Sequence, residues 1–222
     1  MLRFILVRHG QTKWNAGSRG GEHFRGRIEV PLNAKGEAQA EAVARRLAPL
    51  DFAAIYASPL RRAQRTAWPL ARLRGLPVVS FGGLLDVDYG EWSGLPHTEV
   101  AEVWPELYAR WRSAPHTVQF PGGEGLADVR RRVADGLDEI AGRHRDGIVV
   151  LVGHQVVNKV LLCVVLGLEN SAFWRIRQDT CCINRFDYER GARDGAGEYT
   201  LLTLNEVGHL PDPPADLEGL PR

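Results

Sequence analysis

The sequence has few of the features typical of secreted or membrane-bound proteins. Only three of its 222 residues are cysteine and one is methionine. Three cysteines do not make the disulfide framework of a small secreted domain, so we expect a reducing compartment. No apolar run reaches the roughly 20 residues that a membrane-spanning helix needs. The first residues lead directly into an apolar, strand-like segment instead of a charged region and a cleavage site. We therefore expect a cytoplasmic protein with no membrane partner.

An excess of charge of either sign is also missing. The chain has 28 Lys plus Arg against 27 Asp plus Glu. This near balance gives no argument for nucleic acid or an anionic membrane as a partner. Lysine occurs only at positions 13, 35 and 159, so the basic side chains are almost all arginine. Arginine suits two-pronged recognition of phosphate, although a GC-rich genome would produce the same bias.

Strand-like and helix-like segments alternate along the chain. The segments with strand character are 3–7, 53–57, 76–81, 148–152, 182–188 and 199–204, and those with helix character are 34–48, 59–73, 97–112, 124–145 and 155–166. Such alternation predicts an α/β fold, a three-layer α/β/α sandwich with a mostly parallel central sheet. A chain of this length can bury a sizeable core.

The expected boundaries follow from local signals. Asn33 is expected to cap the helix over 34–48. Ser58 and Pro59 are expected to be the N-cap and first residue of the helix over 59–73. We predict a single domain over 1–204, in which 95–120 could form a lid, and an extended, proline-rich tail over 205–222.

Polar side chains follow four of the predicted strands. Arg8 and His9 follow the first, the segment Ser58 to Arg62 the second, a group of acids after Leu84 the third, and His154 the fourth. Ligands bind at the carboxyl edge of open parallel sheets. Convergence of these groups at one edge is what an active site requires.

Several of these segments resemble motifs of the histidine phosphatase (phosphoglycerate mutase-like) superfamily. The matching segments are 6–15, 58–67 and 152–155, with further similarity at 31–36 and 122–126. The resemblance covers most of residues 4–186. It implies a phosphoglycerate mutase-like fold, a phosphohistidine intermediate on His9, and catalysis without a metal or other cofactor. The sequence also has no His-Glu-x-x-His or Cys-x-x-Cys pattern.

The resemblance assigns roles to further residues. His9 can attack phosphorus only through an unprotonated ring nitrogen, so its other nitrogen should donate to a fixed acceptor. Arg8, Arg62, His154 and Asn15 are the candidate phosphate clamp, which would neutralise charge on the transferred group. The motif selects Arg62 rather than its neighbours at 61 and 65, which are expected on an exposed helix face.

Two more residues are candidates for contact with the substrate. Gln155 completes the late motif at a helix N-terminus, which favours anions. Arg25 lies in the first loop, where the family often has a group that contacts substrate, although an ordinary loop arginine is equally consistent with the sequence.

The proton donor is less clear, because three acids lie between Leu84 and Gly94. This acid loop, residues 84–94, is aligned by its Gly-x-Trp-x-Gly spacing. Many relatives have Glu where this chain has Asp86. Asp88 would share a face with Asp86 in an extended segment, and Glu91 has the longer reach. We favour Asp86 as the acid, with a pKa raised by burial, and place Asp88 among the substrate contacts.

The sequence therefore predicts a metal-independent phosphatase that hydrolyses a phosphomonoester of a small metabolite. The main alternative is a cofactor-dependent phosphoglycerate mutase. Mutases of this family usually have a longer insertion than the 27 residues between Gly94 and Gly122. A catalytically inactive phosphate-binding module fits less well, because all four main candidates are present: Arg8, His9, Arg62 and His154. The natural substrate and the oligomeric state, a homodimer included, stay open.

Overall fold

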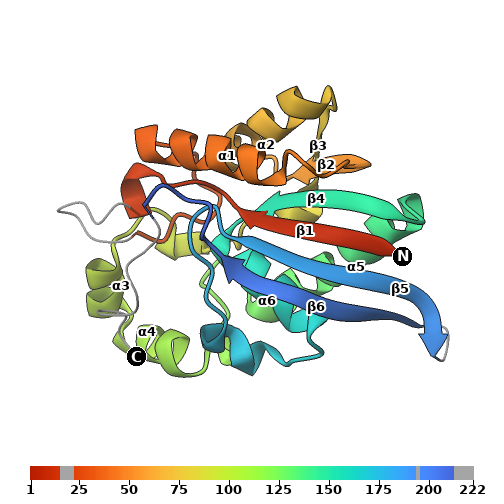
Figure 1. Ribbon diagram of the computed structural model, residues 1–222. Helices are drawn as coiled ribbons and strands as arrows, with labels where there is room; N and C mark the ends of the chain where they lie inside the picture. The colour runs from red at the N-terminus through yellow and green to blue at the C-terminus, as the bar shows by residue number, and fades with distance from the viewer. Residues whose placement is uncertain (16–22, 194–195, 213–222) are drawn as a thin grey trace.

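A six-stranded mixed sheet forms the centre of the protein (Figure 1). The computed structural model describes residues 1–15, 23–193 and 196–212. The strands are β1 (Leu2–Arg8), β2 (Ala54–Ala57), β3 (Val78–Ser80), β4 (Gly147–Gly153), β5 (Ile183–Arg193) and β6 (Ala196–Glu206). Their order is β3-β2-β4-β1-β5-β6, in which the first four are parallel to one another and β5 is antiparallel to both of its neighbours, β1 and β6.

Helices cover both faces of the sheet. Figure 1 shows α1 (Ala34–Leu47) and α2 (Arg61–Arg74) on one face, and α5 (Leu126–Arg143) and α6 (Gln155–Val165) on the other. Within the described ranges, no helix is long and apolar enough to cross a bilayer.

The residues of β1 alternate between the two cores because successive side chains of a strand point to opposite faces. Phe4 and Leu6 belong to the core on the α5–α6 side, and Ile5 and Val7 to the core on the α1–α2 side. The predicted three-layer sandwich with a mostly parallel sheet is confirmed.

The predicted helix over 97–112 is two helices. α3 (His97–Val103) has Trp104 as its C-cap residue, and α4 (Pro105–Ser113) begins at the next residue. Proline disfavours the helical conformation in the residue before it, and Trp104 has φ −126° and ψ 59°. Both helices lie beyond the carboxyl ends of the parallel strands (Figure 1). Short 3-10 turns occupy Lys13–Asn15, Gly82–Leu84, Gly90–Trp92, Pro115–Thr117 and Asn170–Arg175.

Of the two predicted helix starts, the first is confirmed and the second is wrong by two residues. Asn33 caps α1, and its side chain accepts a hydrogen bond of 2.8 Å from the amide of Gly36. α2 begins at Arg61, two residues later than predicted, and its N-cap is Leu60. Ser58 lies just before the helix: its amide donates to Val152 O at 2.9 Å, beside β4, and its Oγ accepts from the amide of Leu60 at 3.4 Å.

The predicted tail is in part packed against the domain. β6 runs to Glu206, past the predicted boundary at 204. Leu210 is buried against the core on the α1–α2 side. Residues within 205–210 therefore contact the sheet or its core, and 213–222 lie outside the described residues.

Candidate active site

The register between β1 and β4 places the two motif histidines side by side. Arg8 is paired with Gly153, and the amide of His9 donates to Gly153 O at 3.0 Å. His154 follows β4 directly and is the N-cap residue of α6. The ring centroids of His9 and His154 are 5.1 Å apart. Strands far apart in sequence thus deliver both rings to the carboxyl edge of the sheet.

His9 has the hydrogen bonding that a nucleophilic imidazole needs. The side chain is fully buried, and its Nδ1 lies 2.7 Å from Gly10 O. A carbonyl only accepts, so Nδ1 carries the proton and Nε2 keeps a lone pair. No described residue hydrogen-bonds to Nε2. Desolvation and then the charge of Arg62 hold the pKa of His9 well below its ordinary 6.5, so the ring is neutral at neutral pH.

Close backbone packing fixes the turn that carries His9. The amide of Gly10 donates to Thr66 Oγ1 at 3.0 Å. A Cβ at Gly10 would lie 2.5 Å from Gly36 O, and a Cβ at Gly36 would collide with Gln11 O. Glycine is needed at both positions because only the absence of a side chain lets this turn approach the start of α1 so closely.

Arg62 connects His154 to the loop after the first 3-10 turn. Its side chain is fully buried, and its Nε donates to His154 Nδ1 at 3.1 Å. Nη1 donates to Ile28 O at 2.8 Å and Nη2 to Gly26 O at 2.6 Å. Because Nδ1 of His154 accepts, its Nε2 carries the proton. No described residue contacts that Nε2 by a hydrogen bond.

His154 is therefore a neutral donor. Desolvation, followed by the charge of Arg62, keeps the pKa of His154 well below 6.5. Its Nε2–H can donate to a bound oxyanion without any change of protonation.

Arg8 is held from the other side of the site. It is 5 % exposed, and its Nη1 donates to Gln178 O at 2.6 Å. Its Nε has no hydrogen-bond partner among the described residues. Gln178 is in turn held by Asn184, whose Oδ1 accepts from Gln178 Nε2 at 2.7 Å. Gln178 lies in an irregular segment without a motif, so no signal in the sequence would have singled it out.

The acid loop brings Asp86, and not Asp88, to the site. Asp86 is 5 % exposed, and its Oδ2 lies 3.5 Å from Arg62 Nη2 and 4.0 Å from His154 Nδ1. Desolvation raises the pKa of Asp86, against the opposing charges of Arg62 and Arg25. Asp88 instead accepts from Gly90 N at 2.9 Å and from Arg27 Nη1 at 3.2 Å.

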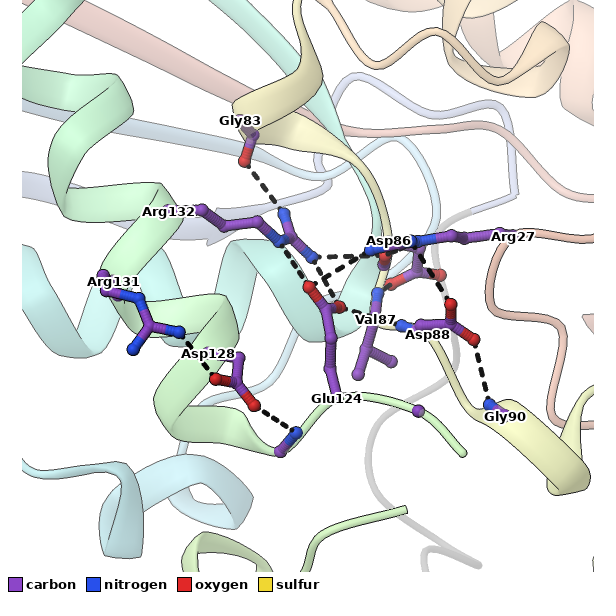
Figure 2. Close-up of polar contacts among 12 residues, drawn as sticks. Arg27, Gly83, Asp86, Val87, Asp88, Gly90, Glu124, Asp128, Arg131 and Arg132 are labelled. Carbon is purple, nitrogen blue, oxygen red and sulfur yellow. Dashed lines mark hydrogen bonds and ion pairs between the residues drawn. The ribbon is translucent and has the colours of Figure 1, made fainter. Parts of the chain in front are cut away.

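A clamp of three charged residues, Arg27, Glu124 and Arg132, holds the main chain of the acid loop (Figure 2). Arg132 donates to Asp86 O at 3.2 Å and to both carboxylate oxygens of Glu124 at 3.1 and 3.2 Å. Glu124 also accepts from the amide of Asp88 at 2.9 Å. Arg27 pairs with Glu124 at 3.1 Å and donates to Asp86 O at 3.4 Å. The two arginines thus fix the backbone at Asp86.

Neither arginine of this clamp could be singled out from the sequence, because each lies among other arginines without a distinguishing motif. Glu124 did lie in a matched segment, 122–126. Its role depends on contacts across three segments and is visible only in the folded chain.

A cavity of about 620 Å³, part of it open to solvent, adjoins these residues. Arg25, Asp86 and Gln155 line it, so the structure brings three predicted residues together there. Arg25 donates to Thr12 Oγ1 at 3.1 Å. Asn15 ends the first 3-10 turn, and its side chain is outside the part that the structure describes. Most of the other lining side chains are aromatic.

The arrangement supplies a nucleophile, N–H donors and an acid within one edge of the sheet. His9 offers a lone pair, Arg8 and His154 offer N–H groups, and Asp86 is an acid whose burial favours its protonated form. Among residues 1–15, 23–193 and 196–212, no cluster of three or more His, Cys, Asp or Glu is arranged to hold a metal ion.

Comparison with known proteins identifies the family. A sequence model of the histidine phosphatase superfamily (branch 1) matches residues 4–196. The chain belongs to the histidine phosphatase superfamily. Phosphoserine phosphatase 1 of Hydrogenobacter thermophilus is 38% identical over 210 residues, which are 95% of each chain. The probable phosphoglycerate mutase GpmB of Salmonella choleraesuis is 31% identical over 97% of this chain and 98% of its own length.

Several solved structures have the same fold. Bacillus stearothermophilus YhfR superposes with a TM-score of 0.85 at 27% identity, over 95% of this chain and 100% of that one. The mycobacterial glucosyl-3-phosphoglycerate phosphatase Rv2419c gives a TM-score of 0.83 at 27% identity, over 92% and 99%. The predicted family and fold are thus confirmed.

Proposed function

We propose that this histidine phosphatase hydrolyses a phosphomonoester of a small metabolite through a phosphohistidine on His9. The observation that carries the proposal is the state of His9, whose Nδ1–H is bound to Gly10 O and whose buried Nε2 lacks a described partner. Relatives that match nearly the whole chain include proteins named as phosphatases of phosphoserine and of glucosyl-3-phosphoglycerate, which supports the reaction class.

In the first half-reaction, Nε2 of His9 attacks phosphorus. The N–P bond forms as the ester P–O bond breaks, and the electron pair of that bond goes to the leaving oxygen. Arg8, Arg62 and the Nε2–H of His154 neutralise charge on the three equatorial oxygens. Asp86 gives its proton to the leaving oxygen, so an alcohol departs.

In the second half-reaction, water attacks the phosphohistidine. The Asp86 carboxylate takes a proton from the water as the new O–P bond forms and the N–P bond breaks. Inorganic phosphate leaves, His9 regains its lone pair, and Asp86 is protonated again. The site returns to its starting state without a metal or other cofactor.

Two of the predicted substrate contacts, Arg25 and Gln155, line the cavity, and we retain both in that role together with Asn15. We assign Asp88 to the structure of the acid loop, because Arg27 and Gly90 occupy its carboxylate. The cytoplasmic location and the homodimer stay predictions. Light scattering of the purified chain tests the second.

The mutase alternative differs only in what receives the phosphoryl group. A hydroxyl of a second substrate would take the place of water. The test incubates the protein with EDTA and with a panel of phosphorylated metabolites that includes phosphoglycerate, and measures phosphate release and isomerisation in parallel. We expect phosphate release to dominate. Faster isomerisation of phosphoglycerate would replace the phosphatase assignment, and phosphate binding without any turnover would favour the inactive module.

A further inference from the structure

The cavity beside the site has a wall made mainly of aromatic rings, which the phosphoryl chemistry does not use. Trp14, His23, His97 and Trp174 all line it and all retain exposed surface. The same wall includes the acid Asp86. An aromatic lining of this kind indicates what the rest of the substrate is made of.

These rings are held in fixed orientations. Trp14 and His23 stack with centroids 4.9 Å apart and planes 18° apart. His97 stacks on the buried Phe24 at 4.2 Å and 16°. Rings that are already ordered lose little conformational entropy when a ligand binds. The wall is therefore preorganised for a flat group.

Trp174 gives a second, independent observation. It is 44% exposed although it is among the largest apolar side chains. Its Nε1–H donates to Trp111 O at 2.9 Å, and Lys159 Nζ lies 4.7 Å from its ring centroid. An exposed indole that a hydrogen bond and a cation–π contact keep in place next to a cavity is typical of a ligand-binding surface.

The position of Asp86 connects this wall to the leaving group. If Asp86 protonates the leaving oxygen, the group attached to that oxygen extends into the cavity that Asp86 itself lines. Aromatic faces offer an anionic leaving group no hydrogen bonds, so away from Arg25 its loss of water in this cavity would be poorly compensated. A planar ring gains offset or edge-to-face contacts with the same faces.

We propose that the alcohol which this enzyme releases carries a planar aromatic or heteroaromatic ring, bound in the aromatic cavity between Trp174 and the Trp14–His23 pair. This proposal rests on the proposed phosphatase function and names its substrate class. None of residues 16–22 is part of the proposed ring-binding site.

The test compares 2-phenylethyl phosphate with n-propyl phosphate. Both release primary alcohols of similar basicity, so the chemical step is matched and only the ring differs. We expect kcat/KM to be about tenfold or more higher for the phenylethyl ester, as one favourable ring contact and its buried area allow. The kcat/KM for a naphthylethyl ester should be at least as high as that for the phenylethyl ester.

Variants assign the preference to the cavity. Trp174→Ala should reduce the phenylethyl-to-propyl ratio severalfold, and Trp174→Phe should restore most of the ratio. The matched control is Trp68→Ala, which removes a tryptophan 56% exposed on α2 and outside the cavity. It should leave the ratio unchanged.

The outcomes distinguish a failure of the proposed aromatic leaving group from a failure of the proposed phosphatase function. Equal kcat/KM for the two esters on the wild-type enzyme, with phosphohistidine formed from both, overturns the aromatic leaving group and keeps the phosphatase. This comparison needs no variant, so a Trp174→Ala protein that fails to fold does not affect it. No turnover and no phosphohistidine with either ester would overturn the proposed function itself.

Discussion

Arg62 donates from Nε to Nδ1 of His154 across 3.1 Å, although 92 positions separate them in sequence. This one bond determines which nitrogen of His154 carries the proton and so directs an N–H toward the phosphate site. Arg62 also donates to two backbone carbonyls of the loop at 26–28. Its role depends on the fork of its guanidinium and not on charge alone.

Arg62→Lys should therefore lower kcat for any phosphomonoester by about 10²-fold or more, because lysine cannot hold His154 and two carbonyls together. The control is Arg61→Lys, at an exposed neighbour on the same helix, which should leave kcat within about twofold of wild type. Steady-state kinetics with inorganic phosphate release as the signal measures both. Wild-type kcat in Arg62→Lys would mean that charge alone is sufficient there.

His9→Asn should abolish covalent catalysis, since the amide has no lone pair on nitrogen for phosphorus. Rapid quenching with labelled substrate should trap acid-labile phosphate on the wild type and none on the variant. His116→Asn, at an exposed histidine, should trap as much as the wild type. Full turnover by His9→Asn would eliminate the phosphohistidine mechanism.

Asp86→Asn should slow alkyl phosphates far more than nitrophenyl phosphate, because nitrophenolate leaves without needing a proton. We expect a loss of about 10²–10⁴-fold on the alkyl ester and a much smaller loss on the nitrophenyl ester. Asp88→Asn should change both rates alike and only slightly. If the leaving-group dependence appears in Asp88→Asn and not in Asp86→Asn, the two acids have exchanged roles.

Glu124→Gln tests whether the clamp positions Asp86. The amide nitrogen cannot accept from Arg27 or Arg132, so the backbone at Asp86 should become less well ordered. We expect the variant to slow alkyl phosphates more than nitrophenyl phosphate, by a smaller factor than Asp86→Asn, and to lose about 1–2 kcal/mol of unfolding free energy. Asp128→Asn, at the exposed Arg131 pair nearby (Figure 2), should lower stability without changing the leaving-group dependence. An identical rate loss on both substrates in Glu124→Gln would reject the positioning role.

The buried histidines predict how stability depends on pH. The pKa of His9 and that of His154 lie well below 6.5 in the folded state, so below pH 6.5 the unfolded chain binds more protons. The free energy of unfolding should then fall as pH falls, by about 1 kcal/mol per histidine between pH 7.5 and 5.5. Denaturant titrations at the two pH values measure the loss, which should be smaller by about that amount in His9→Asn. An equal loss in both proteins would mean that His9 is not held neutral by burial.

Much of the architecture could be predicted because it follows from local patterns. Two apolar runs predicted central strands, one before Arg8 and His9 and one before His154. Each strand is followed at its carboxyl end by candidate site residues. The boundaries of helices were harder to predict where tertiary contacts compete with the local preference of the sequence for a cap. Ser58 has the side chain of an N-cap, yet its amide stays paired with β4, and the helix begins later.

The sequence by itself predicted the family and the layered fold, and it selected His9, Arg62 and His154 as candidate site residues, because these depend on short motifs and on the period of apolar residues. Only the tertiary structure gives a physical reason to favour Asp86 over Asp88 as the candidate acid. Two residues apart on an extended segment they would share a face, but Asp88 bonds back to Gly90, whereas Arg27 and Arg132 fix the main chain at Asp86. The tautomers of both histidines and the aromatic wall likewise depend on groups far apart in sequence, whose mutual distances no local pattern specifies.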